Sequence, residues 1–306
     1  MRTVLIRLGS SLLVLWGAIT VAFAVLQLTP GSTIDAILGT APVTPEARAQ
    51  IVSDLKLDRP VPEQYADFLG RIARGDFGHS YQLHDSVTGA VGRELGSSIQ
   101  LSLVGVGLAF AVSIVVALLT AHRRRSVRSL SSGLELIGVS IPAFWAAILL
   151  LTIFSFKLGW FPAAGADGAS SLVLPAVAVA VPLMAIFTQV LREGLELALD
   201  EPFVATARAR GASDAFVRVR HALRHALLPL VTLVGWLFGM TFGSLVVVET
   251  VFSRPGMGQL ILHAVEGKDL PVVLGVVVLT SVVFVTVNIL QDLAYLIIDP
   301  RLRGAR

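Results

Sequence analysis

Long apolar runs alternate with shorter polar segments along this chain, and six of the runs are long enough to cross a bilayer. A hydrocarbon core about 30 Å thick needs about 20 apolar residues of helix. We therefore predict six transmembrane helices: Leu8–Leu28, Ile99–Ala121, Leu134–Phe156, Leu172–Val190, Ala226–Val248 and Val272–Ile298. The first run is too long for a cleaved export signal, whose apolar core has about 7–15 residues.

Composition supports a membrane protein. Of the 306 residues, 55% are apolar and only 15% are charged, whereas an average soluble domain has about 25% charged residues. These values exclude disordered, collagen-like and coiled-coil chains. The absence of cysteine excludes disulfides, thiol catalysis, iron–sulfur clusters and cysteine-ligated zinc. The predicted class is an all-α polytopic membrane protein.

The basic residues predict the orientation of the helices. Fifteen arginines lie in the two tails and in the loops of one side, whereas the short loops of the other side hold only Lys157, Arg254 and Lys268. Basic loops stay in the cytoplasm, so both termini are predicted to be cytoplasmic. The predicted segments are an N-terminal transmembrane helix (1–28), an external loop (29–98), a five-helix core (99–298) with a cytoplasmic loop (191–225), and a cytoplasmic tail (299–306).

The external loop is too long to be a plain connector. Thr44 is a good N-cap followed by Pro45 at the first helical position, so one helix begins there. A second helix is predicted from near Pro62 to Gly75. Its apolar positions form one stripe: Tyr65, Phe68, Leu69 and Ile72. Two interpretations remain open at this point, a passive cap on the membrane face and a contact surface for an external partner.

The cytoplasmic loop predicts a short helix, a corner and a basic helix. Asp200 can cap a helix that begins with Glu201 and Pro202, and Gly211 can end it. Ser213 can cap the basic helix that follows. This segment is either an interfacial helix held by anionic lipid or a rigid knob for a cytoplasmic partner. The knob would consist of Pro202, Phe203, Ala205, Thr206, Ala207, Arg208, Ala209, Arg210 and Gly211.

Candidate chemistry is sparse. The chain contains no phosphate-binding P-loop, no G-x-S-x-G and no H-E-x-x-H motif, so we assign no catalytic residue. His221 and His225 have the i, i+4 spacing of zinc ligands, but no nearby carboxylate completes a site, and no metal is expected.

One stripe of small residues predicts helix packing. Gly235, Gly239 and Gly243 recur every four residues on the fifth span, a spacing that lets another helix approach closely. The stripe alone does not tell whether that helix belongs to the same chain or to a partner.

Several segments resemble the permeases of binding-protein-dependent ABC importers. The run FVATARARGASDAFVRVRHALRHALLPLV is similar to their cytoplasmic signature loop, with Ala205-Thr206-Ala207, Gly211 and Leu228-Pro229 at the signature positions. The Glu often found at the start of that loop is missing here. The stretch from Val246 to Val273 resembles the first permease subunit of dipeptide, oligopeptide and nickel importers. LTPG, LKLDRPVPEQY, RGDFGHSY and the terminal DPRLR match the same family.

The resemblance implies a fold, partners and a function. The fold would be the type I ABC importer permease fold in a bacterial inner membrane, and the resemblance favours the knob interpretation. The implied partners are a second homologous permease, two ATPase subunits that bind ATP and magnesium, and an external substrate-binding protein; neither nucleic acid nor a cofactor in this chain is expected. The implied solutes are di- or oligopeptides, with nickel chelates or glutathione as alternatives. A hypothesis of another class is a membrane scaffold or receptor subunit that moves no solute.

Overall fold

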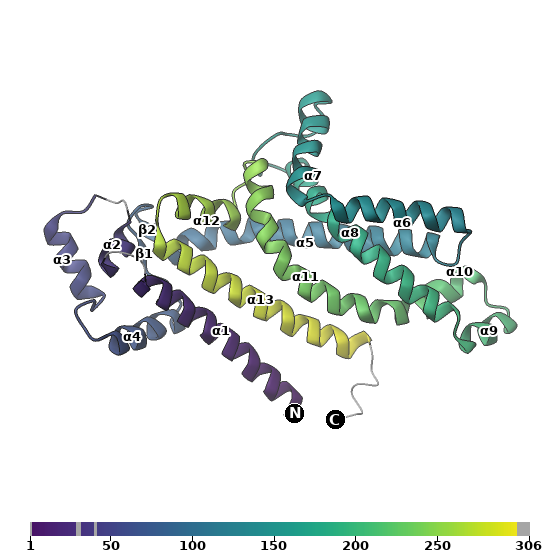
Figure 1. Cartoon of the computed structure of the whole chain (residues 1–306), viewed down its shortest axis with the longest axis horizontal. Helices are drawn as coiled ribbons and strands as arrows, with labels where there is room; N and C mark the ends of the chain where they lie inside the picture. Colours follow the sequence, from purple (N-terminus) through teal and green to yellow (C-terminus); the bar gives the residue numbers. More distant parts are fainter. Residues whose placement is uncertain (1, 29–31, 40–41, 299–306) are drawn as a thin grey trace. The chain divides into compact units, whose positions relative to one another are not determined.

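The computed structural model describes residues 2–28, 32–39 and 42–298 (Figure 1). Within these ranges the chain is helical apart from loops and one two-stranded antiparallel sheet. Two compact units can be distinguished, one with residues 1–98 and 255–286 and the other with residues 99–254 and 287–306. The predicted tail 299–306 with its DPRLR segment, and residues 29–31 of LTPG, lie outside the described residues.

Five described segments are long and apolar enough to cross a membrane, and a bent pair of helices makes a sixth if it is taken as one span. The five segments lie in, or run into, α1 (Arg2–Leu28), α5 (Val87–Thr120), α8 (Ser170–Leu199), α11 (Leu223–Val251) and α13 (Leu270–Ile298). This agrees with the prediction of a polytopic all-α protein, and with its six spans if the bent pair crosses the membrane as one.

The third span differs from its prediction. Instead of one helix over Leu134–Phe156, the chain forms α6 (Arg125–Ser140), then α7 (Ala143–Leu150) and the π-helix η1 (Leu151–Lys157), with a bend of 98° between the two parts. The cause is Pro142, which has no N–H to donate and disfavours helical geometry in the residue before it. Ile141 is accordingly extended, with φ −84° and ψ 113°.

The first unit contains the segment between α1 and α5. Its elements are α2 (Thr33–Leu38), α3 (Pro45–Asp54), α4 (Val61–Ala73), β1 (His79–Ser80), β2 (Asp85–Ser86) and, later in the chain, α12 (Met257–Glu266). The predicted N-cap of α3 at Thr44 is confirmed, because the Ala47 N–H donates to Thr44 Oγ1 at 3.3 Å. The predicted stripe on α4 is also confirmed, and the rings of Tyr65 and Phe68 pack 5.2 and 5.5 Å from that of Phe23 on α1.

Two features of this unit were not predicted from the sequence. The helix α2 is stabilised by a capping box in which Ser32 and Asp35 bind each other's backbone N–H. Hydrogen bonds from the Ser32 hydroxyl and the Arg48 guanidinium lower the pKa of the Asp35 carboxyl. The β-hairpin is anchored by a hydrogen bond from the buried Ser80 hydroxyl to the buried carboxylate of Asp269, just before α13.

In the second unit α8 is the central helix. It packs against α6, α7 and α11. In its most apolar stretch 61% of the residues are buried inside the chain, compared with 28% in that of α5. Small residues allow these close contacts. A Cβ atom added at Gly194 would lie 3.0 Å from Ala226 Cα on α11, and one added at Gly138 on α6 would lie 2.9 Å from Ala185 Cβ on α8.

We predict that Gly194→Leu destabilises the second unit, because the added side chain must push α8 away from α11. Overpacking of this kind costs about 1–3 kcal/mol. The thermal unfolding temperature of the purified protein in detergent should therefore fall. Gly107→Leu is the matched control, since this exposed glycine of α5 has nothing within 4 Å of an added Cβ. Equal unfolding temperatures for the two variants would contradict the packing described here.

Candidate functional site

The predicted knob forms as a short helix, α9 (Pro202–Ala209), which begins one residue later than expected. Its N-cap is Glu201 and not Asp200. Pro202 at the first helical position restricts the residue before it to extended geometry, and Glu201 has φ −71° and ψ 147°. Asp200 ends α8 instead, and its carboxylate lies 3.5 Å from His122 Nε2.

The end of α9 agrees with the prediction of a glycine stop. Gly211 has φ +84°, in the left-handed region that favours glycine. The Gly211 N–H donates to the Arg208 carbonyl at 2.9 Å and the Ala212 N–H donates to the Ala207 carbonyl at 3.1 Å, which is the Schellman pattern. Ser213 then caps α10 (Asp214–Phe216) by accepting from the Phe216 N–H at 3.3 Å, as predicted. The chain continues through the π-helix η2 (Val217–Ala222) into α11.

The helix α9 has an exposed face and a buried face. The side chains of one face pack inward: Phe203, Val204 and Ala207 contact the core of the second unit. The remaining predicted knob residues are exposed: Pro202, Ala205, Thr206, Arg208, Ala209, Arg210 and Gly211. The exposed face is therefore built largely from small side chains, which would let another protein surface come close.

The two histidines with zinc-ligand spacing support this helix. The Phe203 ring lies 5.3 Å from that of His225 and 6.3 Å from that of His221. In the part of the chain that the structure describes, no three His, Asp or Glu side chains are grouped so that they could hold a metal ion. The two histidine rings pack against Phe203 of α9.

A polar connection that the sequence reading missed joins the knob to α5. The Asp214 carboxylate accepts hydrogen bonds from Arg208 Nη2 of α9 at 2.8 Å and from Arg218 Nε of η2 at 2.7 Å. Arg218 Nη1 also donates to the carbonyl oxygens of Ala121 and Leu118, at 2.7 and 3.4 Å. Arg218 is buried, and it satisfies carbonyl groups that the C-terminus of α5 leaves without intrahelical partners. A movement of α9 would therefore also pull on the end of α5, because Arg208, Asp214 and Arg218 connect the two helices by hydrogen bonds.

The three glycines of the predicted packing stripe have different surroundings. Gly235 is buried, and a Cβ atom added there would collide with the Gln291 side chain of α13. Gly239 is partly buried, and Gly243 is exposed with open space around it. The structure thus gives Gly235 a neighbour within the chain, while packing of a partner helix on Gly243 stays a prediction.

A second candidate site is a pocket of about 330 Å³ in the first unit. Apolar side chains form most of its lining and come from α1, α2, α4, α13 and the loops between them, and Arg71, Asp76 and Tyr81 are among the residues that contribute polar groups. Burial raises the pKa of the Tyr81 phenol. Most of the residues that line the pocket belong to the segment between α1 and α5. The α4 stripe alone did not predict a pocket in this segment.

The chain is similar to known transport proteins along nearly its whole length. A Brucella ovis protein, whose name assigns it provisionally to peptide permeases, is 37% identical over 92% of each chain. The di/tripeptide transport system permease protein of Pseudomonas aeruginosa is 30% identical over 98% of each chain. The glutathione transport system permease protein of Escherichia coli is 32% identical over 92% of each chain.

The fold also matches a solved structure. A chain of the inward-facing MetNI methionine ABC transporter superposes with a TM-score of 0.57 at 18% identity, over 69% of this chain and 96% of that one. Residues 112–304 match the family described as binding-protein-dependent transport system inner membrane component. The chain therefore belongs to this family, and it is a multi-pass membrane permease subunit of an ABC transport system.

Proposed function

We propose that this permease forms half of the translocation pathway of an ATP-driven importer for di- or oligopeptides. The observation that carries the proposal is the exposed helix α9, which is closed by a left-handed glycine and bonded to α5 through Asp214 and Arg218. A chain without a nucleotide-binding motif must receive work mechanically, and this helix is a rigid contact of the required kind. The names of the relatives support a peptide solute.

The proposal assigns a partner to each face. Two ATPase subunits that bind ATP and magnesium would dock on the cytoplasmic side, one of them on α9. A second, homologous permease would complete the pathway in the membrane. An external substrate-binding protein would contact the segment of residues 29–98, where the pocket of the first unit lies. Glutathione is the second candidate solute, because one relative is a glutathione permease.

Transport should be measured with the complete complex in proteoliposomes. We expect ATP-dependent accumulation of a radiolabelled di- or tripeptide when the binding protein encoded with the complex is present. Omission of ATP and a free amino acid in place of the peptide are the controls. ATP hydrolysis stimulated by the binding protein without uptake would support the scaffold or receptor hypothesis instead. Uptake of glutathione but of no other peptide would support the narrower function.

The glycine corner provides a test of mechanical coupling. Gly211→Val should weaken ATPase binding or uncouple hydrolysis from uptake, because a side chain in the left-handed region costs about 1–2 kcal/mol. Gly211→Asn is the matched control, since Asn tolerates this region and a Cβ atom here has nothing within 4 Å. Copurification with the ATPases and peptide taken up per ATP hydrolysed are the measurements. If valine couples as well as asparagine, the knob is not the point where work enters.

The proposed orientation can be tested in this cysteine-free chain. Ser126 lies exposed at the start of α6, and Ser53 lies exposed on α3. With both termini cytoplasmic, Ser53→Cys should react with an impermeant thiol reagent added outside intact cells, and Ser126→Cys should react only after the membrane is opened. The reverse labelling pattern would place α9 on the outside and exclude the proposed ATPase contact.

A further inference from the structure

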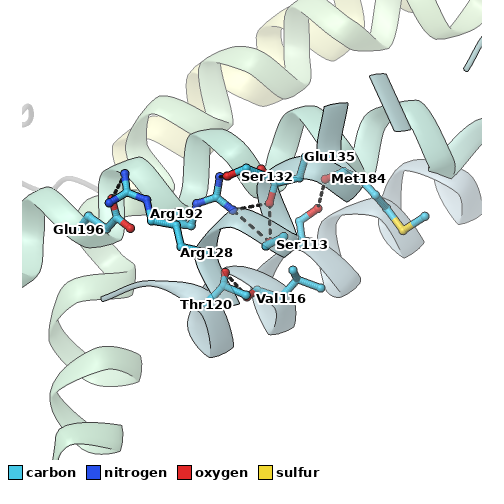
Figure 2. A network of polar contacts seen from close by, with 10 residues as sticks. Ser113, Val116, Thr120, Arg128, Ser132, Glu135, Met184, Arg192 and Glu196 are labelled. Carbon is cyan, nitrogen blue, oxygen red and sulfur yellow. Dashed lines mark hydrogen bonds and ion pairs between the residues drawn. The ribbon is translucent and has the colours of Figure 1, made fainter. Parts of the chain in front are cut away.

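An ion pair between α6 and α8 is almost completely buried (Figure 2). Arg192 of α8 and Glu135 of α6 form two hydrogen bonds, one of them from Nη2 to Oε2 at 2.6 Å, and their side chains are only 8% and 9% exposed. Ser131 completes the group, because its hydroxyl accepts from Arg192 Nη1 at 3.1 Å and donates to Glu135 Oε1 at 2.7 Å.

A second ion pair lies next to the first, nearer the end of α8 that leads to the knob. Arg128 Nη2 of α6 is 3.1 Å from Glu196 Oε2 of α8 (Figure 2). The polarity of the two pairs is opposite, since α8 supplies the arginine of one and the glutamate of the other. We call the pairs Glu135–Arg192 and Arg128–Glu196 the charge ladder.

The opposite polarity makes the ladder sensitive to sliding of the two antiparallel helices. A shift of α8 by one turn, about 5.4 Å, moves Glu196 towards Glu135 in one direction and Arg192 towards Arg128 in the other. Both shifts bring like charges together. The repulsion is stronger between Glu196 and Glu135, whose side chains are 17% and 9% exposed, than between Arg192 and Arg128, because Arg128 is 58% exposed and water weakens the interaction. The close contact between Gly138 and Ala185 further along brings the helices together but offers no side chain that would prevent sliding.

We propose that the charge ladder fixes the register of α6 against α8, so that a push on α9 moves α6 together with α8. Arg128, Glu135, Arg192 and Glu196 are then positioning residues for energy coupling. This inference rests on the proposed function, because α9 follows α8 directly and would receive the push from the ATPase.

A purely stabilising role leads to a different expectation. Buried ion pairs add little stability compared with apolar residues of similar size. If the ladder only fills space, E135L/R192M should fold and couple normally. If the ladder fixes register, this variant should bind the ATPases and hydrolyse ATP, but the peptide taken up per ATP should fall roughly 3- to 30-fold, the range for mutations that change coupling.

Charge swaps test the ladder more directly. E135R/R192E keeps an ion pair at each position, but α6 then carries only arginines and α8 only glutamates, so one-turn shifts bring opposite charges together. Adding R128E/E196R restores the alternation. We expect the double mutant to lose coupling and the quadruple mutant to regain it. Equal coupling in both would overturn the proposal.

Disulfide trapping measures register even if the proposed transport function is wrong. Gly138→Cys with Ala185→Cys reports the native register. Gly138→Cys with Gln189→Cys should crosslink only after a shift of one turn, because residue 189 then takes the place of residue 185. We expect the crosslink between residues 138 and 189 to form in E135R/R192E. It should be absent when the ladder is native and absent in the quadruple mutant. A crosslink at 189 that is no more frequent in E135R/R192E than with the native ladder would overturn the proposal, whatever solute is transported.

Discussion

No water reaches the hydrocarbon core of a bilayer, so the polar groups that its helices bury must find partners within the protein. Two buried side chains of the second unit illustrate this constraint. The Ser113 hydroxyl donates to the Ala109 carbonyl at 2.6 Å and lies 3.1 Å from the Met184 carbonyl of α8, and Arg192 is matched by Glu135 and two serines. Both side chains thereby join α8, the span with the largest buried share, to a neighbouring helix: Ser113 joins it to α5 and Arg192 joins it to α6.

Features determined by neighbouring residues could be predicted from the sequence. The number of spans follows from the length of the apolar runs, and the caps at Thr44 and Ser213 and the stop at Gly211 follow from local backbone chemistry. Pro142 carried the signal for the break in the third span. A proline alone does not predict such a break, because prolines inside helices are tolerated in membranes, and Pro175 and Pro182 remain within α8.

Features that depend on distant residues could not be predicted in the same way. An ionisable residue at the edge of an apolar run needs a partner. The chain contains 21 arginines that could pair with Glu135, and the one that does so, Arg192, is 57 positions away. The same holds for the knob. Its helix and its corner were recognised from local pattern, whereas the connection from Asp214 through Arg218 to Ala121 depends on how α5 and η2 pack. The glycine spacing on α11 predicted close packing but could not distinguish Gly235, which meets Gln291, from Gly243, which is open.

The hydrogen bond between Ser80 and Asp269 has a consequence for the order of biosynthesis. The two residues are 189 positions apart, and α12 and the start of α13, which complete the first unit, also lie beyond residue 255. At a translation rate of about 5–20 residues per second, roughly 10–40 seconds separate the synthesis of the two partners. The hairpin therefore emerges from the ribosome long before its anchor exists, and most of the chain must be inserted before the first unit can close. A nascent chain that stops before Asp269 would leave this unit incomplete and open to proteases, so quality control could distinguish truncated subunits from complete ones.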